Sequence, residues 1–199
     1  MVRGMAKAAT SAGVLLPGLL WAASTTAHEK QLHLGLDAGV STVTFSEELA
    51  ASGYGGGAYV AYGLDDTFNL RAQFDLQIYE LPEPLTSALV YAPTVGAEYV
   101  FDVMQWVLYA GVLAGPANVA VQTEADRWQG VLQVPFGVKY LLTGELDSPV
   151  ALGLEGQYRA FLFGPEGSPS DTFAGLLRFE YIFSFGDETD IPNPQVGSR

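Results

Sequence analysis

The longest strictly alternating stretch of the chain runs from Phe68 to Tyr79. Its apolar members are Phe68, Leu70, Ala72, Phe74, Leu76 and Ile78, and between them lie Asn69, Arg71, Gln73, Asp75, Gln77 and Tyr79. Successive side chains of a strand point to opposite faces, so a period of two separates these sets. The stretch therefore predicts a β-strand with one apolar and one polar face.

Seven further segments show the same alternation, over residues 32–41, 58–64, 89–101, 106–114, 132–142, 150–162 and 177–185. Three connections are short and polar (65–67, 102–105 and 143–148), as hairpin turns are. The other four, 44–57, 80–88, 116–129 and 164–172, are longer and rich in Gly, Pro, Ser and acids. Turns at one end and longer loops at the other are typical of outer-membrane barrels. An even strand number puts both ends of the barrel on the short-turn side.

The two faces of these segments differ completely in charge. The apolar faces carry no Asp, Glu, Lys or Arg, whereas the opposite faces carry Asp37, Arg71, Asp75, Glu98, Lys139, Glu155, Arg159, Arg178 and Glu180. A soluble barrel or sandwich also has alternating strands, but it turns its apolar face inward. The interior of an eight-stranded barrel holds only a few side chains or one small ligand. The apolar residues must therefore face hydrocarbon, which predicts an all-β, eight-stranded antiparallel up-and-down transmembrane β-barrel.

This arrangement places four positive and five negative groups in the lumen. An unpaired charge in a narrow, poorly hydrated interior is costly, so we expect an interlocked ionic network filling it. Specific partners do not follow from the sequence, because barrel shear shifts the heights of neighbouring strands. The alternative is that some of these groups contact lumen water without a specific partner.

The first 27 residues are typical of a secretory signal peptide. Arg3 and Lys7 precede an apolar stretch, and Thr25-Thr26-Ala27 offers small residues for cleavage after Ala27. An N-terminal anchor helix is the alternative, but the stretch is interrupted by Pro17-Gly18 and is short for a spanning helix. We expect a barrel over residues 28–185 and a short periplasmic tail over 186–199.

Composition narrows the possible functions. Charged residues make up 16% of the 199, the net charge is −13, and cysteine is absent. Nucleic-acid binding is excluded because it needs clustered Lys and Arg. The lack of cysteine excludes disulfides, thiolate metal sites and a lipid-bearing N-terminal cysteine.

The segment from Gln31 to Phe185 resembles the small outer-membrane barrels of the OmpA/OmpX/OmpW type. Val134–Tyr140 looks like a strand common in such barrels. The final segment resembles the strand that the outer-membrane assembly machinery recognises, with its alternating aromatics Phe179, Tyr181, Phe183 and Phe185. The chain departs from the family by continuing past Phe185, and this tail is too short for a peptidoglycan-binding domain.

The resemblance implies a monomer in the outer membrane of a Gram-negative cell envelope. Outer-membrane lipids, lipopolysaccharide and the assembly machinery are its expected partners. Pro93 and Pro135 fall inside predicted strands, where they indicate β-bulges.

Catalysis is not expected. Some eight-stranded outer-membrane barrels modify lipids, but this needs a serine activated by a histidine where lipid reaches it. His28 adjoins the cleavage point and His33 points into the lumen, and no apolar face of the predicted strands offers a serine. No cofactor or metal site is expected either, since Glu47-Glu48 and Glu124-x-Asp126 are expected to be solvated loop charges.

The four long connections hold eight acids against the single base Arg127, namely Glu47, Glu48, Glu80, Glu83, Glu124, Asp126, Glu166 and Asp171. One hypothesis is that divalent cations bridge these acids to lipopolysaccharide. The other is that the acids are simply solvated by water. The expected function is a closed barrel with a structural or surface-interaction role. A narrow channel for small apolar solutes is the alternative, and a lipid-modifying enzyme is a third.

Overall fold

A computed structural model describes residues 30–46, 49–81, 87–103, 105–121, 127–142, 150–164 and 168–184. Several predictions fall outside these ranges: the signal peptide over residues 1–27, the tail over 186–199, and the side chains of His28, Glu47, Glu48, Glu83, Glu124, Asp126, Glu166 and Phe185.

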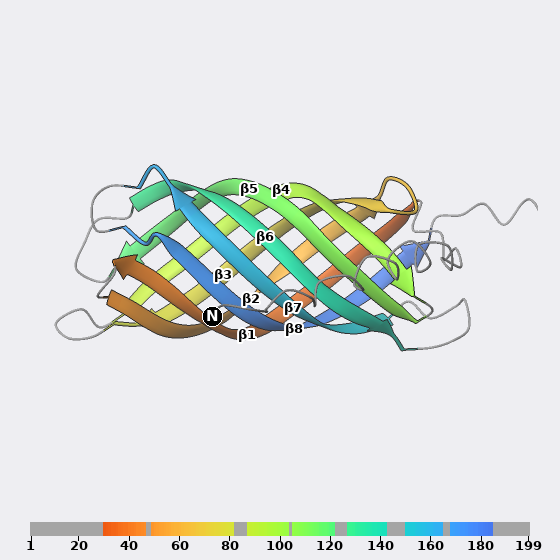
Figure 1. Cartoon of the computed structure of the whole chain (residues 1–199), viewed down its shortest axis with the longest axis horizontal. Helices are drawn as coiled ribbons and strands as arrows, with labels where there is room; N and C mark the ends of the chain where they lie inside the picture. The colour runs from red at the N-terminus through yellow and green to blue at the C-terminus, as the bar shows by residue number, and fades with distance from the viewer. Residues whose placement is uncertain are drawn as a thin grey trace, which may run out of the picture.

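Eight antiparallel strands form one closed barrel in which each strand pairs with its neighbours in sequence and β1 pairs with β8 (Figure 1). Their bounds are β1 Gln31–Ser46, β2 Leu49–Gly63, β3 Phe68–Glu80, β4 Ser87–Val103, β5 Trp106–Val121, β6 Arg127–Leu141, β7 Val150–Leu162 and β8 Asp171–Ser184. The predicted up-and-down barrel is confirmed. No helix in the described part of the chain is long and apolar enough to cross a membrane.

The bulges predicted at Pro93 and Pro135 are wrong. Pro93 pairs with Phe74 of β3, and the ladder between β4 and β5 has the same register before and after it. Pro135 pairs with Gln157 of β7, again with no shift. A proline lacks one N–H donor and interrupts the ladder toward one neighbour only, so the strand continues in register. The register shift in the described ladders lies instead between Thr44 and Ser46 of β1.

The strands extend further toward the loop end than the sequence indicated. Most of the predicted 44–57 loop is strand. Ser46 pairs with Leu49, and after the register shift between Ser46 and Thr44 the β1–β2 ladder continues without a break to the short-turn end. β5 and β6 likewise extend into the predicted 116–129 loop. The strands have 13 to 17 residues, more than the 9–11 or so that a tilted transmembrane strand needs.

The outer surface of the barrel is apolar on every strand. Exposed large side chains include Leu36, Tyr62, Leu70, Val95, Val112, Leu132, Leu154 and Leu177, with Leu36 62% and Leu177 68% exposed. The outward-facing charged residues on the described strands are Glu80 and Asp171, both at the loop end. The side chains that alternate with this surface point into the lumen and are buried.

At the loop end this polarity reverses on two strands. On β1, Leu36 and Val40 point outward and are exposed, whereas Val43 and Phe45 further along belong to a buried cluster. On β3, Tyr79 is buried in the same cluster while its neighbour Glu80 is exposed. The period of two continues, but the apolar face changes sides.

The seam between β1 and β8 that closes the barrel is tight at one point. Gly39 pairs with Leu176, and a Cβ on Gly39 would lie 2.0 Å from the backbone oxygen of Gly175. A Cβ on Gly175 itself would meet nothing within 4 Å. Glycine is therefore required on the β1 side of this contact and not on the β8 side.

The turn between β2 and β3 is held by Asp65. Its Oδ1 accepts hydrogen bonds from the backbone N–H of Thr67 at 2.7 Å, the hydroxyl of Thr67 at 2.9 Å and the backbone N–H of Phe68 at 2.8 Å. These bonds, the Thr67 backbone bond foremost, hold the pKa of the Asp65 carboxyl below its ordinary value of 3.8. The side chain thus fixes the register of the β2–β3 hairpin.

Candidate functional site

All nine charged residues assigned to the lumen point inward and are buried. They come from β1 (Asp37), β3 (Arg71, Asp75), β4 (Glu98), β6 (Lys139), β7 (Glu155, Arg159) and β8 (Arg178, Glu180), with exposed fractions of 0 to 6%. Alternation along each strand places them there, because their neighbours in sequence occupy the outer face. The structure brings eight of the nine into ion pairs.

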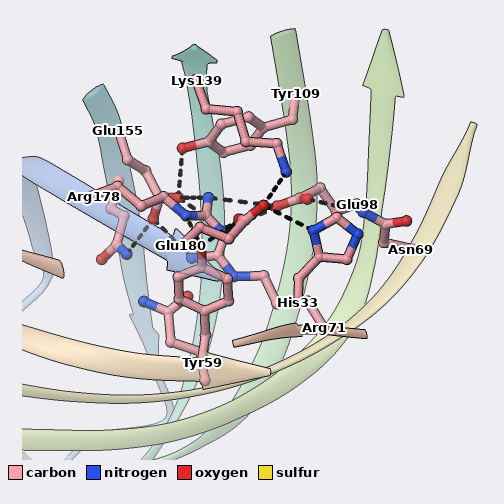
Figure 2. A network of polar contacts seen from close by, with 12 residues as sticks. His33, Tyr59, Asn69, Arg71, Glu98, Tyr109, Lys139, Glu155, Arg178 and Glu180 are labelled. Atoms are coloured by element: carbon pink, nitrogen blue, oxygen red, sulfur yellow. Dashed lines mark hydrogen bonds and ion pairs between the residues drawn. The ribbon is translucent and has the colours of Figure 1, made fainter. Parts of the chain in front are cut away.

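Glu155 lies at the centre of the network, between two arginines (Figure 2). Arg71 donates to both of its carboxylate oxygens at 2.9 Å, and Nη1 of Arg178 donates to Oε2 at 2.5 Å. Arg71 also donates to Glu98 at 2.9 Å. Two-pronged contact between a guanidinium and a carboxylate is the strongest common form of ion pair and fixes both side chains. The network therefore crosses the lumen from β3 to β7 and β8.

A second carboxylate, Glu180, collects three further donors. Nζ of Lys139 lies 2.6 Å and Nδ1 of His33 lies 2.8 Å from Oε1, and the Tyr59 hydroxyl donates to Oε2 at 2.5 Å. Arg178 lies 3.7 Å from the same carboxylate. Glu180 is thus linked through Arg178 to Glu155, and the two centres form one network.

Two tyrosines belong to this network that the sequence did not predict. The hydroxyl of Tyr59 accepts from Nε of Arg178 at 2.5 Å, and the hydroxyl of Tyr109 donates to Glu155 at 2.9 Å. The guanidinium carbon of Arg178 lies 3.7 Å from the ring centre of Tyr59 and 4.6 Å from that of Tyr109, as cation–π contacts do. Tyr59 lies on β2 and Tyr109 on β5, two strands whose two faces differ little in polarity. Their inward position in the alternation was the available signal.

A second group lies around Arg159. Nη2 of Arg159 pairs with Asp75 at 2.7 Å and donates to Gln157 at the same distance, and Nε donates to Gln133 at 2.9 Å. Gln157 in turn donates to Glu155 at 2.6 Å, which joins this group to the first.

Of the nine lumenal charges, Asp37 is the one that has no ion pair within the described part of the chain. Arg178 is its register partner on β8, but that guanidinium is turned toward Glu155 and Tyr59. Neither carboxylate oxygen of Asp37 has a hydrogen-bond partner among the described residues.

Apolar clusters lie on both sides of the charged region. Toward the short turns, Val100, Val107 and Tyr109 pack with Leu141. Toward the loops, one cluster is formed by Val43, Ala51, Tyr79, Leu81, Ala88, Val90 and Val119, and a second by Ala92, Ala117 and Val131, with Phe161 packed against both. The ionic network is thus enclosed between apolar layers.

The other predicted residues lie elsewhere. Phe179, Tyr181 and Phe183 are exposed on the outer face of β8, and the rings of Tyr181 and Phe183 contact each other at a tilt of 57° with their centres 4.5 Å apart. His33 is buried in the lumen on Glu180, away from the outer face. Within the described ranges, no three histidine or acidic side chains come together as metal ligands.

Comparison with known proteins identifies the fold. No family model and no curated protein matches the sequence. Among solved structures, Neisserial surface protein A has a TM-score of 0.62 at 17% identity, with 79% of this chain and all of that chain covered. Ail, the attachment invasion locus protein of Yersinia pestis, has 0.52 at 13% identity, covering 78% of this chain and 99% of that one. OprG from Pseudomonas aeruginosa has 0.50 at 12% identity, covering 78% and 98%.

The chain therefore has the fold of the small eight-stranded outer-membrane barrels, as the sequence predicted. At these identities the likeness concerns the fold alone.

Proposed function

We propose that this chain is a β-barrel protein of the bacterial outer membrane, exported through the periplasm, with a closed lumen and a structural or surface-interaction role. The apolar outer surface supports the location, since exposed large apolar side chains on all eight strands are stable only against acyl chains. The exposed aromatic residues of β8 support insertion by the assembly machinery. Outer-membrane lipids and lipopolysaccharide are the proposed contacts, and the barrel acts as a monomer.

The observation that carries the closed lumen is the enclosed ion-pair network. Arg71, Glu155 and Arg178 are linked across the barrel and are at most 2% exposed. An open pore needs a continuous path of water or solute, and separating these charges without new partners costs several kcal/mol. The apolar layers at both ends further restrict entry. The alternative role, a narrow channel for small apolar solutes, requires this network to part.

Conductance across a planar bilayer tests the closed lumen. The purified wild-type protein is expected to give no stable unitary conductance. In a triple variant, Arg71→Ala, Glu155→Ala and Arg178→Ala, three large side chains are removed from the lumen, and conductance is expected to appear. Stable wild-type openings, or wild-type liposomes that swell in small uncharged solutes faster than protein-free ones, would contradict the proposal.

Fractionation tests the location separately. The protein is expected to stay with the outer membrane through alkaline washing and to be released only by detergent. Recovery in the soluble periplasmic fraction would overturn the location, whatever the conductance.

A further inference from the structure

Asp37 and Asp75 face each other across a glycine. Asp37 of β1 pairs with Gly57 of β2, and Gly57 pairs with Asp75 of β3, so the three residues form one row across neighbouring strands. Because Gly57 has no side chain, nothing from β2 separates the two carboxylates. Both aspartates point into the lumen and are at least nine-tenths buried.

Oxygen atoms surround the position that a side chain of Gly57 would take. A Cβ there would lie 2.7 Å from the backbone oxygen of Phe74, 2.8 Å from Oδ1 of Asp75 and 3.1 Å from Oδ1 of Asp37. The last two distances limit the separation of the two Oδ1 atoms to about 5.9 Å. One ion with oxygen ligands at about 2.3–2.6 Å spans such a gap after a small side-chain adjustment.

Asp37 lacks hydrogen-bond donors, whereas Asp75 is contacted by Gln73 and by Arg159. Both carboxylate oxygens of Asp37 are without a hydrogen-bond partner among the described residues, although the side chain is only 6% exposed. The amide nitrogen of Gln73 donates to Asp75 Oδ1 at 2.7 Å, and its amide oxygen, also buried, has no partner in the described part of the chain. Buried polar atoms are ordinarily paired, so the two unpaired oxygens of Asp37 call for a positive partner.

The charge on Asp37 gives the valence of that partner. The buried lumenal side chains include five carboxylates (Asp37, Asp75, Glu98, Glu155, Glu180) and four bases (Arg71, Lys139, Arg159, Arg178), and His33 adds a positive charge beside Glu180 when it is protonated. Each carboxylate except Asp37 lies within 4.0 Å of a basic group. Asp37 is therefore the carboxylate of this set whose single negative charge has no basic partner among the described residues.

We propose that the space over Gly57, between Asp37, Asp75 and Gln73, binds one small monovalent cation of the sodium type inside the barrel. The donor set consists of oxygen atoms alone, which suits hard cations and not transition metals. The ion neutralises Asp37 and ties β1 to β3 across β2. This site is independent of the conductance of the lumen and of the location of the protein.

Thermal unfolding in matched salts tests the site. The full chain is refolded into a zwitterionic detergent in either NaCl or N-methylglucamine chloride at equal ionic strength and equal pH, since N-methylglucamine is too large for the lumen. At a sodium concentration tenfold above the dissociation constant, the wild-type Tm is expected to be about 4 °C higher in NaCl. Equal Tm values in the two salts overturn the proposal and leave a proton as the neutralising group of Asp37.

Variants locate the effect. Asp37→Asn is expected to abolish the sodium-dependent shift, and Gln73→Leu, which keeps both carboxylates, to reduce it. Glu80→Gln removes one outward-facing carboxylate at the loop end and is expected to keep the full shift. A shift that persists in Asp37→Asn overturns the assignment.

Sodium-23 NMR of the wild-type protein gives a readout that does not depend on the folding of a variant. We expect the sodium-23 signal to be broadened by the protein. Added KCl should leave this broadening in place, whereas added LiCl should remove it by competition. The absence of broadening beyond that of detergent alone overturns the proposal.

Discussion

Glu155 forms ion pairs with two arginines, Arg71 on one side and Arg178 on the other. Buried ion pairs contribute little net stability when intact, because both groups lose their hydration. Removing one member, however, leaves the other buried and uncompensated. The effect of a substitution here therefore depends on what remains behind.

Glu155→Gln keeps the shape of the side chain but removes the carboxylate that Arg71 and Arg178 share. We expect it to lower the free energy of unfolding by about 3–5 kcal/mol, because both buried arginines lose this negative partner. Urea unfolding in lipid vesicles, followed by tryptophan fluorescence, measures the loss. Glu80→Gln, an exposed carboxylate, is the matched control and is expected to change stability by at most about 0.5 kcal/mol. Equal effects of the two substitutions would contradict the central place of Glu155.

At this scale, the sequence gives orientation but not partners. Alternation alone places Arg71 and Glu155 in the lumen. That they meet depends on the barrel shear, which brings together residues separated by 84 positions in the chain. Tyr59 and Tyr109 were missed for a different reason: a tyrosine is suited to either face, so its polarity does not reveal its direction.

At the seam between β1 and β8, the two strands differ in the space that they leave for an added side chain. Gly39→Ala places a methyl group against the backbone oxygen of Gly175, where no side chain can move aside. We expect the substitution to lower stability by about 1–3 kcal/mol, as overpacking does, and to slow closure of the barrel. Refolding into detergent micelles, followed by the shift in gel mobility between unfolded and folded forms, measures both.

Gly175→Ala is the control on the facing strand. Its methyl group would meet open space, and losing a glycine reduces the entropy of the unfolded chain. Unchanged or slightly higher stability is expected, by up to about 1 kcal/mol. Similar losses for the two alanine variants would show that the close approach at Gly39 does not limit closure.

The strands themselves were predictable near the short turns and less so near the loops. Phe68–Tyr79 keeps one apolar face, and the structure extends β3 by only one residue beyond it. Residues 44–57 were assigned to a loop because they are rich in glycine, serine and acids, and in the structure the apolar face also changes sides beyond Val40. Both features weaken the alternation of apolar and polar residues, yet the backbone pairing continues through them.

For the whole molecule, the outer surface decides where the protein is stable. Leu36→Arg puts a cation in the middle of the apolar outer face, at a side chain that is 62% exposed. In a bilayer we expect this to cost about 2–4 kcal/mol, as arginine does near the midplane. Urea unfolding in phospholipid vesicles measures the change.

Leu64→Arg is the matched control, because Leu64 is similarly exposed at 56% but lies in the turn after β2. There the arginine reaches the interface, and the expected change is about 0–1 kcal/mol. If both substitutions were equally mild, the apolar surface would not be facing hydrocarbon.

The change of apolar face along β1 has a consequence for immersion. On the short-turn side of this change, Leu36 and Val40 point outward. On its loop side, Thr42 points outward and Val43 points inward. A shift of the barrel by a few ångströms toward the loop end would leave leucine and valine in water, and the opposite shift would press threonine against acyl tails. The position of this change along β1 thus sets the depth at which the barrel is immersed in the membrane. A bilayer of different thickness must therefore adapt to the protein.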